Sequence, residues 1–166
     1  SPKAYQFLHL PVQSGSPAML EAMNRGYLPE DFVSLAEKLR RASPRMTLAT
    51  DIIVGFPGET EEDHRSTVDM LKEVRPDIVN VTRFSPRQGT PAARARNQVP
   101  GWVAKERSRE ITKLRFEISQ EINGAMVGSR ERITITEEGS DVGLEVVARL
   151  ADGASQGQAT LYRRVQ

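Results

Sequence analysis

The chain has 166 residues, of which 27% are charged and 38% are apolar, so it is long enough for one or two folded cores and too apolar for an intrinsically disordered protein. Its formal net charge of +1 at pH 7 indicates no partner by itself. The lack of cysteine excludes disulfides, thiolate-bound zinc and cysteine-bound iron–sulfur clusters from this stretch of sequence.

The first third of the chain predicts a strand and two helices. Residues 5–12 form a short apolar run that a Gln-Ser-Gly-Ser turn ends, which is typical of a strand. Ser16 followed by Pro17 predicts a brief helix, because a hydroxyl N-cap and a proline in the first turn both suit a helix start. A second helix is predicted over residues 29–41. Its apolar face at helical spacing consists of Phe32, Leu35, Ala36 and Leu39.

The middle of the chain repeats the strand–helix order. Residues 47–54 are rich in β-branched residues and predict a strand that ends in Gly-Phe-Pro-Gly. Thr60 and Asp63 then predict the capping box of a helix, which continues until Pro76. Residues 77–84 predict a third strand.

The last part of the chain begins with a Pro/Arg-rich loop over residues 85–101. One long helix is predicted over residues 102–123, and its buried stripe consists of Ile111, Leu114, Ile118 and Ile122. Three short strands separated by polar turns follow, at residues 132–136, 144–150 and 158–165.

This order of elements predicts an α/β fold. Three consecutive strand–helix units are typical of a parallel sheet with right-handed crossovers, and the closing strands predict an antiparallel module that begins near Gly124. In parallel α/β folds, ligands bind at the carboxyl ends of the strands. The sequences there are unusual, combining glycine and proline with amide, hydroxyl, aromatic or guanidinium groups: residues 9–16, 51–60 and 83–91.

Several residues in these segments also have purely structural interpretations. Gly-Phe-Pro-Gly can serve only as a strand-to-helix turn, and Asp51 can cap backbone amides as readily as it contacts a ligand. We expect His9 to be a hydrogen-bonded core histidine and His64 to be exposed. Glu61 and Glu62 suit the dipole of a helix N-terminus and are not expected to be catalytic.

Positive charge gathers between residues 83 and 115. The basic residues of this segment are Arg83, Arg87, Arg94, Arg96, Lys105, Arg107, Arg109, Lys113 and Arg115. Only Glu106 and Glu110 oppose the charge of the helical part. A basic stretch that runs from a strand-end loop into a helix suits contacts with phosphates, and a solvated helix face explains it equally well.

Together, the three strand ends resemble the methylthiotransferase family of radical S-adenosylmethionine (SAM) enzymes. Residues 9–16 followed by residues 23–27, Met-Asn-Arg-Gly-Tyr, resemble the fourth-strand motif of this family. Residues 50–60 resemble the fifth-strand motif, and residues 84–92 resemble the sixth. The final strands are similar to the start of a TRAM domain, a small RNA-binding β-barrel.

The resemblance implies that residues 1–124 are the C-terminal half of a partial (βα)6 radical SAM barrel and that residues 125–166 begin a TRAM-like domain. It also implies SAM and two [4Fe–4S] clusters as cofactors. The cysteines that hold the clusters in this family have no counterpart here. The sequence opens without methionine and ends on residues typical of a strand interior, so we expect an inactive fragment of a longer cytoplasmic enzyme.

The resemblance also implies which residues form the site. The expected SAM-binding residues are Gln13, Ser14, Asp51, Ile53, Gly55, Pro57, Phe84 and Ser85. The residues expected to face an RNA substrate are Arg83, Arg87, Thr90, Arg94 and Arg96. No catalytic residue and no metal ligand is expected within this chain.

The implied reaction replaces a hydrogen of a tRNA nucleoside by sulfur and a SAM-derived methyl group. Residues 83–87 and 100–107 look most like the archaeal and eukaryotic type, which acts on N6-threonylcarbamoyladenosine next to the anticodon. The alternatives are isopentenyladenosine in tRNA, an aspartate of a ribosomal protein, and a fragment that binds tRNA without chemistry. An open sheet edge beside residues 5–12 further predicts self-association.

Overall fold

The computed structural model describes residues 7–128, 133–135 and 148–150. The chain divides into two units, one of residues 8–126 and one that contains residues 127–166. Residues 7–126 form three strands and five helices. No helix in the described ranges is long and apolar enough to cross a membrane.

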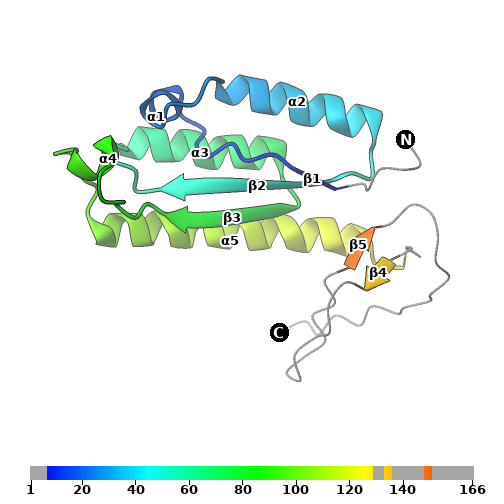
Figure 1. Cartoon of the computed structure of the whole chain (residues 1–166). Helices are drawn as coiled ribbons and strands as arrows, with labels where there is room; N and C mark the ends of the chain where they lie inside the picture. Colours follow the sequence, from blue (N-terminus) through cyan, green and yellow to red (C-terminus); the bar gives the residue numbers. More distant parts are fainter. Residues whose placement is uncertain (1–6, 129–132, 136–147, 151–166) are drawn as a thin grey trace. The chain divides into compact units, whose positions relative to one another are not determined.

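A three-stranded sheet forms the centre of the larger unit (Figure 1). Its order is β1 (Phe7–His9), β2 (Thr47–Val54) and β3 (Ile78–Arg83). β2 and β3 are parallel, with Asp51 beside Asn80. β1 is shorter than the strand predicted over residues 5–12, of which residues 5 and 6 lie outside the described ranges. The chain after β1 still pairs with β2, through a parallel bridge between Gln13 and Ile52.

The helices follow the predicted order. They are α1 (Pro17–Ala22), α2 (Pro29–Ala42), α3 (Glu61–Val74), α4 (Pro91–Arg94) and α5 (Gly101–Ala125). Figure 1 shows α3 and α5 running along the paired β2 and β3. The short α4 interrupts the segment predicted as a continuous loop, because the Thr90 hydroxyl caps it by accepting a bond from the Ala93 amide.

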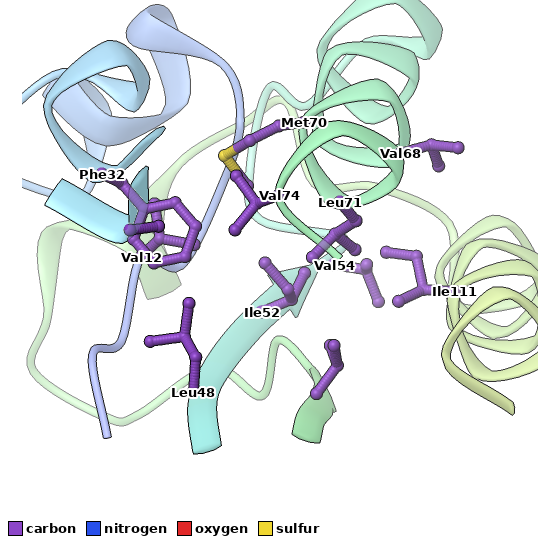
Figure 2. Packing of buried hydrophobic residues seen from close by; sticks show 12 residues of the cluster. Val12, Phe32, Leu48, Ile52, Val54, Val68, Met70, Leu71, Val74 and Ile111 are labelled. Atoms are coloured by element: carbon purple, nitrogen blue, oxygen red, sulfur yellow. The ribbon is translucent and has the colours of Figure 1, made fainter. Parts of the chain in front are cut away.

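The core lies between one face of the sheet and the helices. Leu48, Ile52 and Val54 of β2 are buried there, as the period-2 alternation of a strand requires. Figure 2 shows Ile52 and Val54 with Leu71 of α3 and Ile111 of α5 in one apolar cluster. The predicted stripe of α2 was partly wrong. Phe32 and Ala36 are buried, but Leu35 is 40% exposed because it lies off the face that packs on the sheet.

The opposite face of the sheet carries a different set of residues. Asp51 and Ile53 of β2 alternate with the buried positions and are partly exposed. On β3, Ile78, Asn80 and Thr82 are exposed in the same way. Within the described part of the chain, the helices thus cover one face of the sheet and leave this open face to solvent.

The smaller unit contains an antiparallel pair, β4 (Ile133–Ile135) and β5 (Ala148–Leu150). This pair confirms that short antiparallel strands follow α5. The strand predicted over residues 158–165 lies outside the described residues, and the TRAM-like identity of this part stays a prediction. α5 continues two residues past the predicted end at residue 123.

The start of α3 is held by a predicted capping box. The Thr60 hydroxyl accepts a bond from the Asp63 amide, and the Asp63 carboxylate accepts bonds from the Thr60 amide and hydroxyl. The Ser16 hydroxyl also donates to this carboxylate, at 2.5 Å. Partial burial alone would raise the pKa of Asp63, but the hydrogen bonds from Ser16 and Thr60 hold its pKa below the ordinary value.

This lowered pKa makes the contribution of Asp63 to stability depend on pH. Because the folded pKa is the lower one, the stabilisation is fully present above the ordinary Asp pKa of about 3.9 and is lost as the pH falls through the folded value. We expect Asp63→Asn to lower the free energy of unfolding by about 1 kcal/mol at pH 7, and by less at pH 3. Urea unfolding at both pH values measures this.

The matched control is Glu62→Gln, which removes a neighbouring charge from the same helical turn. Glu62 is exposed and its carboxylate has no hydrogen-bond partner among the described residues. Its loss is expected to change the free energy of unfolding by less than about 0.5 kcal/mol. Equal losses for both variants would contradict the role given to the Asp63 hydrogen bonds.

Candidate functional site

The carboxyl ends of the three strands meet at one edge of the sheet. Gln13 bridges to Ile52 near the end of β2, and the Phe84 amide donates to the Val54 carbonyl at 2.8 Å. The rings of Phe56 and Phe84 then pack edge to face, with centroids 5.0 Å apart. The structure therefore brings the three unusual strand-end segments together, as the parallel topology predicts.

Gln13 has a strained backbone at this edge. Its φ of 74° lies in the left-handed region, which residues with a Cβ rarely adopt. The Gln13 amide donates to the Asp51 carbonyl, and its own carbonyl accepts from the Ile53 amide, both at 2.9 Å. Strain of this kind costs roughly 1–3 kcal/mol and clusters at ligand sites, so it supports a functional role for this buried residue.

The turn after Gln13 is anchored on α3. The Thr67 hydroxyl accepts a bond from the Gly15 amide at 2.9 Å, and it lies 3.2 Å from the Ser14 hydroxyl. The Ser14 hydroxyl also accepts from the Ser16 amide. Ser14 is buried and its hydroxyl bonds to protein atoms, which explains its residue type structurally. A contact between Ser14 and SAM stays a prediction.

The glycine-rich segment after β2 is held by a buried ion pair. Glu59 Oε2 accepts the Gly55 amide at 2.6 Å and the Arg107 guanidinium at 2.8 Å. Arg107 also donates to the Glu59 carbonyl at 3.1 Å. The two side chains are only 2% and 8% exposed. Arg107 therefore does not belong to an exposed basic surface, because its charge is neutralised inside the protein.

Gly55 is required by packing on α5. Its φ is +75°, and a Cβ built on it would lie 2.5 Å from the Cβ of Ala104. The side of Gly55 where a side chain would stand faces α5, so glycine is the residue that lets the loop pack this closely on Ala104. A contact between Gly55 and SAM stays a prediction.

Hydrogen bonds join all three strands on the open face. Asp51 Oδ1 accepts a bond from Asn80 Nδ2 at 2.9 Å and lies 2.9 Å from His9 Nε2. The side chains of His9 and Asp51 are 43% and 31% exposed. The expectation of a core histidine was wrong for burial and right for hydrogen bonding, because β1 turns His9 away from the helices.

His64 was expected to be exposed and is buried instead, with 2% of its side chain accessible. It lies on the face of α3 that packs against α5, where His64 Nε2 is 2.8 Å from Glu110 Oε2. A shallow cleft forms beside this pair, and an exposed Trp102 lines part of it. The prediction was wrong because it rested on the acidic neighbours of His64 in the sequence, which do not reveal that α5 covers this face of α3.

The remaining predicted residues occupy the same edge. Ile53 and Phe84 are half-buried, Pro57 is buried and Ser85 is exposed. The Thr90 hydroxyl donates to the Arg87 carbonyl at 2.8 Å in addition to capping α4, so its residue type is explained locally. The predicted arginines are all exposed, at the end of β3 and around α4: Arg83, Arg87, Arg94 and Arg96.

The fit of these residues to the expected cofactors differs. A carboxylate on the open face and an aromatic pair at the strand ends suit a nucleoside such as SAM. A [4Fe–4S] cluster requires thiolates, and the chain has no cysteine. Among the described residues, no group of three or more His, Asp or Glu side chains could hold a metal ion.

Comparison with known proteins identifies related sequences. Residues 3–71 match the Radical SAM superfamily. The chain is 50% identical over 141 residues to a probable threonylcarbamoyladenosine tRNA methylthiotransferase of Archaeoglobus fulgidus, covering 85% of this chain and 33% of that protein. It is 47% identical over 126 residues to a tRNA-2-methylthio-N(6)-dimethylallyladenosine synthase of Acetivibrio thermocellus, covering 76% of this chain and 26% of that protein. The chain thus spans about a third or less of these curated relatives.

A solved structure supports the fold. Coproporphyrinogen III oxidase from Escherichia coli, a radical SAM enzyme, superposes with a TM-score of 0.52 and 21% identity. The match covers 76% of this chain and 27% of that one. At this identity the likeness concerns the fold alone, and it agrees with the predicted α/β class and the parallel sheet.

The packing of Gly55 on α5 gives a test with a built-in control. Gly89 also has a positive φ, of 89°, but a Cβ there would meet no atom within 4 Å. We expect Gly89→Ala to lower the free energy of unfolding by roughly 1–2 kcal/mol from backbone strain alone. Gly55→Ala should cost clearly more, because it adds the clash with Ala104. Urea unfolding of both variants measures the difference.

The double variant Gly55→Ala/Ala104→Gly removes the clash while it keeps the strain. Because a glycine in a helix itself costs roughly 1 kcal/mol, the single variant Ala104→Gly is the reference for the double variant. Gly55→Ala should cost clearly less in the Ala104→Gly protein than in the wild type. An equal cost in both would show that contact with Ala104 is not the reason for the glycine.

The buried ion pair predicts a large effect from loss of one partner. Arg107→Met leaves the Glu59 carboxylate buried without its counter-charge, so we expect the free energy of unfolding to fall by roughly 3–5 kcal/mol. Arg109→Met, at an exposed position of the same helix, should change it by less than about 0.5 kcal/mol. Similar losses in the two variants, measured by chemical unfolding, would refute this account.

Proposed function

We propose that this chain forms the C-terminal part of a radical SAM methylthiotransferase of tRNA, which acts on N6-threonylcarbamoyladenosine next to the anticodon. The identity of 46–50% to three proteins named for this nucleoside supports the proposal most strongly. Five relatives named for dimethylallyladenosine are 39–47% identical. These ranges overlap, so isopentenyladenosine is the second candidate substrate.

The geometry at the strand ends supports a SAM site. In this proposal Gln13, which follows β1, contacts the ligand together with Asp51 and Ile53 of β2, and Phe84 packs against its adenine. When bound, SAM supplies the adenosyl group for hydrogen abstraction and the methyl group for transfer. The chain's own residues bind and orient it, while the Glu59–Arg107 pair holds the adjoining loop in place.

Iron–sulfur ligands lie outside this chain in the proposal. Because the chain has no cysteine, it supplies no thiolate, and the clusters expected of a radical SAM enzyme would be held by other parts of the protein. We therefore expect residues 1–166 alone to have no methylthiotransferase activity. SAM and tRNA chemistry would require the full-length, cytoplasmic enzyme.

The exposed arginines support contact with RNA. Arg83 is the last residue of β3, Arg94 is the last residue of α4, and Arg87 and Arg96 lie on either side of α4. Exposed guanidinium groups next to a nucleoside site suit the phosphates of a tRNA. The part that begins at residue 125 would form a TRAM-like RNA-binding domain.

Mass spectrometry of tRNA from a strain that lacks the full-length gene tests the proposal. We expect the 2-methylthio group to disappear from threonylcarbamoyladenosine and to return when the gene is restored. Loss of the group from isopentenyladenosine would support the second candidate substrate instead. An unchanged set of tRNA nucleosides would refute methylthiolation of tRNA and direct attention to a ribosomal protein.

A further inference from the structure

The carboxylate of Asp51 is held from two sides on the open face. His9 Nε2 from β1 and Asn80 Nδ2 from β3 each lie 2.9 Å from the same oxygen, Oδ1. Asp51 stands on the middle strand, directly opposite Asn80 in the register of the parallel pair. The carboxylate of the middle strand thus accepts hydrogen bonds from side chains of both neighbouring strands.

This arrangement leaves the second carboxylate oxygen of Asp51 available. Among the described residues, Oδ2 has no hydrogen-bond partner, and the side chain is 31% exposed. Two bonds to Oδ1 restrict rotation of the carboxylate, so they fix the direction in which Oδ2 points. A carboxylate oxygen with free lone pairs accepts hydrogen bonds from hydroxyl or ammonium groups.

Stability alone does not explain this polar row, which consists of the side chains of His9, Asp51 and Asn80. An ion pair as exposed as that of His9 with Asp51 contributes roughly 0–1 kcal/mol. The other residues on this face of β2 and β3 include Ile53, Ile78 and Thr82, which are ordinary strand residues. The backbone of Asp51 also accepts the amide of Gln13, the residue with the strained φ. The polar row is therefore continuous with the candidate ligand site.

We propose that His9 and Asn80 are positioning residues, which hold Asp51 so that Oδ2 accepts a hydrogen bond from a hydroxyl or ammonium group of bound SAM. This inference rests on the proposed function, which places Asp51 in the SAM site. It adds a role for two residues that need not touch the ligand, because each acts through the orientation of the Asp51 carboxylate.

The test is the affinity of the full-length enzyme for SAM, measured by equilibrium dialysis with its clusters in place. Asp51→Asn should weaken binding roughly 10–100-fold, since a charge-assisted hydrogen bond is lost. His9→Leu should weaken it roughly 3–10-fold because the carboxylate loses one of the two bonds that orient it. His9→Gln should restore binding to within about twofold, because the terminal amide can donate from nearly the position of Nε2.

A double-variant cycle separates positioning from a direct contact. If His9 acts only through Asp51, His9→Leu should have little further effect once Asp51→Asn is present. Asn80→Ala should behave in the same way, and it provides the test if His9→Leu fails to fold. Ile78→Ala is the matched control, because it removes a side chain from the same open face and should leave SAM affinity unchanged.

The outcomes distinguish the proposed SAM site from the positioning role of His9 and Asn80. Wild-type enzyme that does not bind SAM overturns the proposed function, and this inference with it. Wild-type binding that Asp51→Asn weakens but neither His9→Leu nor Asn80→Ala changes overturns the positioning role alone. Fully additive effects of His9→Leu and Asp51→Asn likewise overturn it, whereas non-additive effects with rescue by His9→Gln support it.

Discussion

The ion pair between Glu59 and Arg107 is the constraint on which the candidate site depends. It joins the loop after β2 to α5 inside the protein, where both charges would be costly without each other. Because Glu59 also accepts the Gly55 amide, the same carboxylate sets the path of the backbone at the strand edge. Gly55 also packs closely on Ala104 of α5. The position of α5 and the shape of the loop after β2 are therefore determined together.

The two faces of the sheet have different physical roles. One face buries apolar residues such as Ile52 against the helices and provides the stability of the unit. The open face carries Asp51 with its partners His9 and Asn80, whose hydrogen bonds stabilise little but orient a carboxylate. A rigid, well-packed layer thus presents a polar row beside the strand ends, which is the arrangement expected of a preorganised binding site.

Local sequence signals predicted the elements well because short-range interactions determine them. The bounds of β2 were predicted correctly, and the capping box of Thr60 with Asp63 formed as expected, since both depend on neighbours within a few residues. The errors concern contacts between distant segments. His64 lies 46 residues from Glu110, and no pattern within α3 reveals that α5 covers it.

The sequence by itself therefore determined the order of strands and helices, the strand-end motifs and the resemblance to radical SAM methylthiotransferases, because each is written in adjacent residues. Only the tertiary structure decided which of these residues face the helices and which face the open side of the sheet. It placed Arg107 in a buried pair rather than on a basic surface, and it brought His9 to Asp51 across two strands. Such assignments depend on strand pairing and helix packing, which join residues tens of positions apart.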